Sequence, residues 1–137
     1  MKSTLLIVCF ACAFASRVLC DAPKLRVSID AQGENGAAAK LVGLLSQEFR
    51  KLDSVAVTDT APELKITCVL VALARPSQNP IGYAASVAVT SGDDRLITHL
   101  VQTQGTLEKL AHEITLTLDG TVLEARRRAA PEHTASP

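Results

Sequence analysis

Histidine and carboxylate side chains are the groups in this sequence that could do metal or acid–base chemistry, and their spacing supports neither. His112-Glu113 begins like a zinc-protease helix. Such a site needs a second histidine four residues after the first, so that both imidazoles face one ion. Leu116 occupies that position. We therefore interpret His112 and Glu113 as the polar flank of a helix, and we expect no metal.

The remaining titratable residues do not form a recognisable catalytic set. His99 lies on an expected strand, and we predict a partly buried, hydrogen-bonded core residue. Asp93, Asp94 and Glu63 lie beside expected turns, where carboxylates are solvated. General acid–base catalysis would need such groups in a cleft with different environments. The sequence has no nucleophile elbow, phosphate-binding loop or dinucleotide fingerprint. It predicts no enzyme and no cofactor.

The first twenty residues have the order of a secretory signal peptide: a basic start, an apolar run over residues 5–14, and small residues after it. Cleavage after Ala15 or after Cys20 fits this pattern, and we expect the mature chain to begin near Asp21. A bacterial lipid anchor on Cys20 would need a small residue before it, and Leu19 is bulky. The apolar run is shorter than the about 20 residues of a membrane span. The sequence predicts a periplasmic or extracellular protein without a transmembrane helix.

Composition limits the mature chain to one domain, expected over residues 21–128, with a disordered tail over 129–137. The 14 basic and 14 acidic residues balance, which argues against nucleic-acid binding. Tyr83 and Phe49 are the aromatic residues outside the signal, too few for stacking platforms. Cys68 lies in an apolar run, and we predict a buried thiol without reactivity.

Hydrophobic periodicity predicts an α+β fold. Alternating apolar residues indicate strands, and apolar residues on one helical stripe indicate helices. The elements expected in chain order are a strand over 25–30, a helix over 37–52, strands over 55–58, 64–74, 83–90 and 96–104, and a second helix with an apolar stripe that begins at Leu107 and includes Leu118. Strand 64–74 is apolar on both sides, so we expect a central strand covered on both faces. Asp119-Gly120 is expected to kink or end the last helix, although Val122 extends its stripe.

These elements predict a mixed or antiparallel sheet of about five strands, with two helices packed on one face. Three segments together resemble the small exported α/β modules of the TolB amino-terminal and CsgG/LpoB-like type: residues 25–29, the helix over 41–52 with residues 54–59 after it, and the apolar strand that begins at Leu64. The resemblance implies a protein-binding module of the cell envelope without catalysis.

The function predicted from the sequence is a non-enzymatic adaptor, exported to the envelope, that binds another envelope protein through a sheet edge or a loop. The loop residues proposed for contact are Arg75, Pro76, Asn79, Pro80 and Tyr83.

Three arginines at the end of the last helix allow two interpretations. Arg126, Arg127 and Arg128 could contact an anionic surface, or they could favour the negative end of the helix dipole.

Two other functions stay open. A small apolar ligand could lie between sheet and helices, where Ala84, Ser86 and Ala88 would leave room. A hydrolytic enzyme would need His99 and an acid to converge.

Overall fold

The computed structural model describes residues 23–34, 36–74 and 79–129. The predicted signal peptide, Cys20, Arg75, Pro76 and residues 130–137 of the predicted tail lie outside these residues. The elements in chain order are β1 (Leu25–Gln32), α1 (Ala37–Arg50), β2 (Val55–Val57), β3 (Leu64–Leu73), β4 (Gly82–Ser91), β5 (Leu96–Gln104), α2 (Leu107–Leu118), the π-helical turn η1 (Asp119–Leu123) and α3 (Glu124–Ala129).

The five strands form one mixed sheet in the order β2-β1-β3-β4-β5. β1 lies parallel to β2 and β3, and β3, β4 and β5 follow as antiparallel neighbours. Helix α1 provides the long crossover that a parallel connection needs, whereas short loops suffice for the antiparallel strands. The predicted α+β fold, with about five strands and two helices, is confirmed.

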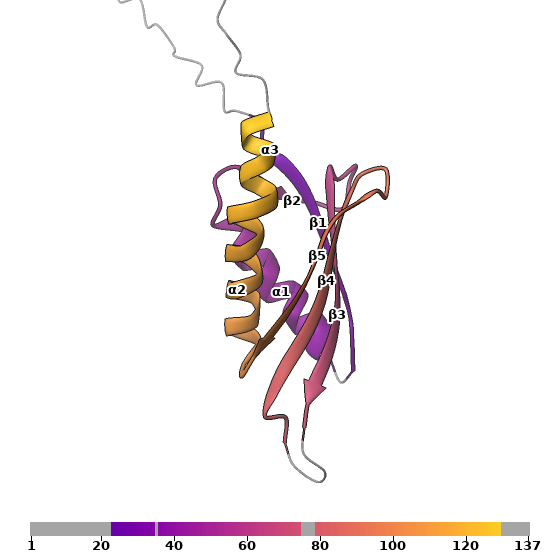
Figure 1. Cartoon of the computed structure of the whole chain (residues 1–137), viewed down its shortest axis with the longest axis vertical. Coiled ribbons are helices and arrows are strands. Elements are labelled where there is room, and N and C mark those ends of the chain that lie inside the picture. The colour runs from indigo at the N-terminus through magenta and orange to yellow at the C-terminus, as the bar shows by residue number, and fades with distance from the viewer. Residues whose placement is uncertain (1–22, 35, 75–78, 130–137) are drawn as a thin grey trace, which may run out of the picture.

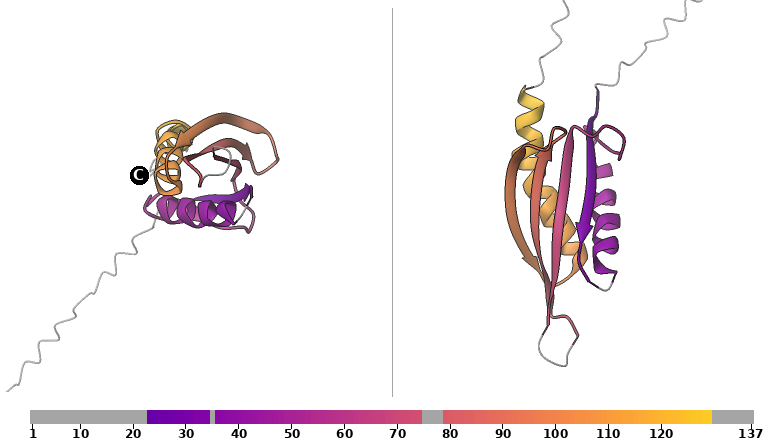
Figure 2. Two further views of the ribbon diagram at one scale, coloured as in Figure 1. Left: turned by 90° about the horizontal axis from the view of Figure 1, so that it is seen from below. Right: turned by 90° about the vertical axis from the view of Figure 1, so that its right-hand side faces the viewer.

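Both helices lie on the same face of the sheet. Figure 1 shows α1 and the α2–α3 rod side by side on one side of the strands, and the right-hand view of Figure 2 looks onto the opposite face. None of the described helices crosses that opposite face (Figure 2). The fold is thus two layers, with the apolar core between them.

Apolar side chains at helical spacing hold α1 against the sheet. Ala38, Leu41, Leu45 and Phe49 are buried along one stripe. The helix begins after Gly36, whose φ of 72° places it in the left-handed region that glycine tolerates best. Phe49 and Leu41 are fully buried and are among the largest side chains of the core.

Helix α2 begins with a side-chain cap and is followed without a break by the π-helical turn η1. The Thr106 hydroxyl accepts a hydrogen bond from the Lys109 backbone N–H at 3.3 Å, which satisfies one of the free N–H groups of the first turn. α2 ends at Leu118, where Asp119-Gly120 was expected to kink or end the helix, and the π-helical turn η1 then carries the chain into α3, in line with the expected extension to Val122. Val122 and Leu123 are buried in that turn, so core packing offsets the low helix propensity of Gly120.

Strand β3 is central, as predicted, but the described elements cover it on one face alone. Leu64, Ile66, Cys68 and Leu70 are buried beneath the helices. The intervening Val69 is exposed, as are Val71 and Leu73 at the far end of the strand. The prediction of cover on both faces is wrong because both helices pack on the same side.

Candidate functional site

One side of the sheet carries side chains that the core of the described residues does not use. Register places one alternate set of side chains from three neighbouring strands on this side. We call this surface the open face; it comprises Thr67, Val69, Val71 and Leu73 of β3, Ala84, Ser86 and Ala88 of β4, and His99, Val101 and Thr103 of β5.

The centre of the open face is apolar. Val69, Val71 and Val101 are 48%, 55% and 62% exposed. Between these valines runs β4, where Val71 faces Ala84 and Val101 faces Ser86 across the strand pairs. The small side chains of β4 therefore lie in a row between the larger, β-branched side chains of β3 and β5. A contiguous apolar surface on a folded domain is commonly a contact site for another molecule.

Ala84, Ser86 and Ala88 therefore lie away from the helices. Their strand neighbours Ala85 and Val87 point into the core and are fully buried. The room that a ligand carrier would need between sheet and helices is not formed by these three residues. Their small size instead shapes the solvent side of the sheet.

A serine and a histidine meet on the open face. The Ser86 hydroxyl and His99 Nε2 lie 2.7 Å apart, joined by a hydrogen bond. The predicted hydrogen bond of His99 is confirmed, but its predicted place in the core is wrong, since the residue is exposed. The sequence placed His99 in the core because it shares a strand face with the apolar Ile97 and Val101, and both of these residues are themselves exposed.

This pair does not form a catalytic centre among the described residues. A serine nucleophile needs a base that a third group orients and an oxyanion hole of free N–H donors. In the described residues no carboxylate bonds to His99. Ser86 lies in mid-strand between β3 and β5, where the sheet hydrogen bonds occupy the backbone N–H groups. The pair can position the imidazole, but residues 23–34, 36–74 and 79–129 supply no group that would activate the serine.

The two edges of the sheet differ in length and protection. β2 has three residues, whereas β5 has nine. Sheet edges are usually blunted by short strands, charged side chains or proline. β5, with the sequence LITHLVQTQ, contains no Lys, Arg, Asp, Glu or Pro. Its one protective feature is the irregular pairing near Thr90. The long edge is the less protected one.

The predicted interaction loop is only partly described, and its described members do not form one surface. Asn79 and Pro80 are exposed. Tyr83 is half-buried and packs against the core. Ile81, which the sequence did not single out, is 59% exposed beside them. The predicted role of this loop in binding therefore stays a prediction. Tyr83 contributes to the packing of the core.

Two of the three arginines of α3, Arg127 and Arg128, contact acidic side chains of η1 and α3. Arg127 pairs with Asp119, and its Nη1 lies 3.1 Å from the Glu124 carboxylate. The hydrogen bond with Asp119 raises the pKa of Arg127. Arg128 Nε also bonds to Glu124, at 3.0 Å. The predicted contact of Arg126, Arg127 and Arg128 with an anionic surface stays a prediction, weakened by these pairs.

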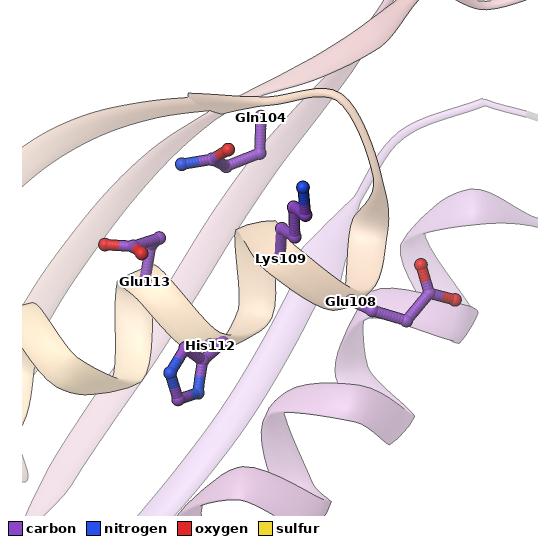
Figure 3. A pocket seen from close by; sticks show the side chains of 5 residues that line it. All are labelled: Gln104, Glu108, Lys109, His112 and Glu113. Carbon is purple, nitrogen blue, oxygen red and sulfur yellow. The ribbon is translucent and has the colours of Figure 1, made fainter.

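A shallow depression lies where β5 turns into α2, lined by Gln104, Glu108, Lys109, His112 and Glu113 (Figure 3). Two of its groups pair with α1: Glu108 lies 2.8 Å from Lys40, and His112 Nδ1 lies 3.1 Å from Glu48. Glu113 and Gln104 lie on the other side of the helix from His112 (Figure 3). The titratable groups do not converge, and their described contacts join the two helices.

The other predicted residues have structural contacts. The Glu63 carboxylate accepts a hydrogen bond from the Arg26 backbone N–H, and Asp94 pairs with Lys65 at 2.6 Å. Cys68 is fully buried, as predicted, and burial raises the pKa of its thiol to about 12. Such a thiol is protonated and unreactive at neutral pH.

Within residues 23–34, 36–74 and 79–129, no three metal-ligating side chains gather at one point. In the same part of the chain, every helix is too short or too polar to cross a membrane.

Comparison with known proteins shows the fold class of this chain. A two-layer α+β domain of this kind occurs in a Xanthomonas campestris protein of the DUF330 family, with a TM-score of 0.57, 11% identity, and 80% of this chain and 89% of that chain covered. It also occurs in PelC from Paraburkholderia phytofirmans, crystallised as a dodecamer, with a TM-score of 0.53, 10% identity, and 71% and 87% covered. A second PelC dodecamer gives a TM-score of 0.50 at 9% identity, with 72% and 88% covered. No family model and no curated protein matches the sequence.

Proposed function

We propose that this chain is an exported, non-enzymatic binding module that holds another protein of the cell envelope against the uncovered surface of its sheet. The observation that carries the proposal is the open face, whose central valines are about half exposed on a rigid sheet. Burying a valine or leucine side chain contributes about 1.5–3 kcal/mol. Several such side chains on one face therefore provide the apolar centre that protein interfaces need.

Three further points support the proposal. The signal-peptide pattern of the first twenty residues and the resemblance to TolB amino-terminal and CsgG/LpoB-like modules both favour the envelope. The PelC neighbours are dodecamers, so this fold serves as an assembly unit in another protein. No carboxylate within the described part of the chain bonds to His99, and this favours binding over hydrolysis at the Ser86–His99 pair.

Affinity capture from the native envelope tests this function. The purified chain from Asp21 to Pro137 should retain a protein partner, and the variant V69K/V71K should lose it, because two charges at the centre of an apolar interface are costly to bury. Leu116 is 53% exposed on α2, on the opposite layer. The matched control L116K adds a charge to an equally exposed apolar site and should keep the partner. Equal capture by all three proteins would contradict the use of the open face.

A further inference from the structure

The outer edge of β5 carries hydrogen-bonding groups that the described part of the fold does not use. β5 pairs with β4 on one side, and in the right-hand view of Figure 2 it is the outermost strand, with no described segment beyond it. An edge strand presents a row of free N–H and C=O groups to any chain of matching length. A peptide or strand that pairs with such an edge binds through its main chain.

The side chains of β5 favour pairing. They include Ile97, Thr98, Val101 and Thr103, β-branched residues that stabilise strands. Leu96 and Val101 are 61% and 62% exposed, so pairing would remove apolar surface from water. A nine-residue edge with high β-propensity, no proline and no charge is a feature that monomeric proteins usually avoid.

We infer that β5 pairs with β5 of a second copy of this chain, antiparallel across a two-fold axis. The inference goes beyond the proposed function, because it names an occupant for the edge of the sheet and not for its open face. Full overlap of two nine-residue strands requires that Leu100 lies opposite Leu100 of the partner subunit. His99 then faces the partner's Val101, and Thr98 faces the partner's Gln102. Such a pair would form about eight to ten new backbone hydrogen bonds.

Charge is compatible with this register. No charged residue of one β5 meets a like charge of the other, because the strand contains none. The nearest charge, Arg95, would lie opposite the partner's Gly105. Directly opposed like charges destabilise a strand pair. Their absence at every position removes the usual obstacle to self-pairing.

The length of the strands selects this arrangement over a ring of head-to-tail copies. A head-to-tail ring built by sheet extension would pair β5 of one copy with β2 of the next. β2 has three residues, so most of the nine residues of β5 would stay unpaired. Self-pairing of β5 uses the whole edge and closes after two copies. The two joined sheets would also bring their open faces into one continuous surface.

Light scattering and sedimentation of the chain from Asp21 to Pro137 should give twice the monomer mass at high concentration. The variant H99K/V101K places two like-charge pairs in the predicted register and should weaken the dimer about tenfold or more. Mixing it with H99E/V101E should restore the dimer, since each lysine then faces a glutamate. V69K/V71K changes the open face on β3, away from the edge, and should leave the mass unchanged.

Disulfide trapping tests the register without added charge. Equal amounts of H99C and V101C proteins should form a mixed disulfide dimer faster than either protein alone, because positions 99 and 101 face each other. The buried Cys68 should not compete.

A monomeric wild type, or a larger assembly, or a dimer indifferent to H99K/V101K, would overturn the inference. Loss of the dimer in V69K/V71K would also overturn it and would point to face-to-face packing. Loss of envelope capture in V69K/V71K with the dimer intact would leave both proposals standing. Retained capture with an intact dimer would refute the proposed function alone.

Discussion

Replacing Val87 and Val71 separately with alanine measures whether one face of the sheet is uncovered. The two valines lie on neighbouring strands and point to opposite sides. Val87 is fully buried beneath the helices, whereas Val71 is 55% exposed. Each substitution removes the same two methyl carbons. The difference between the two losses of unfolding free energy therefore measures how far each side chain is buried by the rest of the fold.

The magnitudes follow from burial. Each buried carbon contributes about 0.8 kcal/mol, and a cavity in the core adds to the loss. V87A should therefore reduce the free energy of unfolding by about 2–3 kcal/mol. V71A loses about half of the transfer contribution and leaves no cavity, because water fills the space, so the loss should be about 0.7 kcal/mol.

Thermal unfolding followed by circular dichroism provides the assay. At about 4 °C per kcal/mol for a domain of this size, V87A should lower the Tm by about 10 °C and V71A by about 3 °C. Urea unfolding should give the same ranking with unchanged m-values. Equal losses at the two sites would refute the assignment of the open face, because they would mean that Val71 is covered as well as Val87.

Three further predictions concern single residues. G92A should destabilise the fold by about 1–3 kcal/mol in thermal unfolding, because its Cβ would lie 2.7 Å from the Pro62 carbonyl oxygen. G43A has open space around its Cβ and should stabilise α1 by up to about 1 kcal/mol. A G92A variant as stable as the wild type would refute the close approach. Cys68 should resist a thiol reagent at pH 8 until the chain unfolds, and rapid labelling of the native protein would contradict its burial. The hydrogen bond from Lys51, and then that with His112, lowers the pKa of Glu48 in the folded state. Glu48 should therefore add stability above the unfolded pKa of about 4.5, and this stability should be lost as the pH falls through the lower folded value. E48Q should make the stability depend less on pH in the acid range, and an unchanged pH dependence would contradict the pairing.

The sequence predicts the order and type of the elements well because periodicity is a local property. Leu41, Leu45 and Phe49 recur at helical spacing, and the structure buries all three. β5 was predicted with its observed bounds over 96–104. The low propensity of Gly120 predicted an interruption, and the change from α2 to η1 falls there, whereas Val122 predicted the continuation and is buried in it.

The candidate site was predicted less well because cover is a property of the whole fold. Val69 and Val71 extend an apolar run that looks the same whether a helix packs over them or not. The number of predicted helices could have indicated the uncovered face, since two helices packed on one face of the sheet leave the other face without a helix. His99 was placed in the core for the same reason, although its hydrogen bond was foreseen.

Photo-crosslinking in the native host tests the central claim most directly. A photoreactive amino acid at position 71 samples the open face, and one at position 116 samples an equally exposed apolar site on α2. We expect position 71 to form a discrete protein adduct of defined mass and position 116 to form none. Adducts from position 116 alone, or none from position 71, would contradict the claim that this face of the sheet is the working surface of the protein.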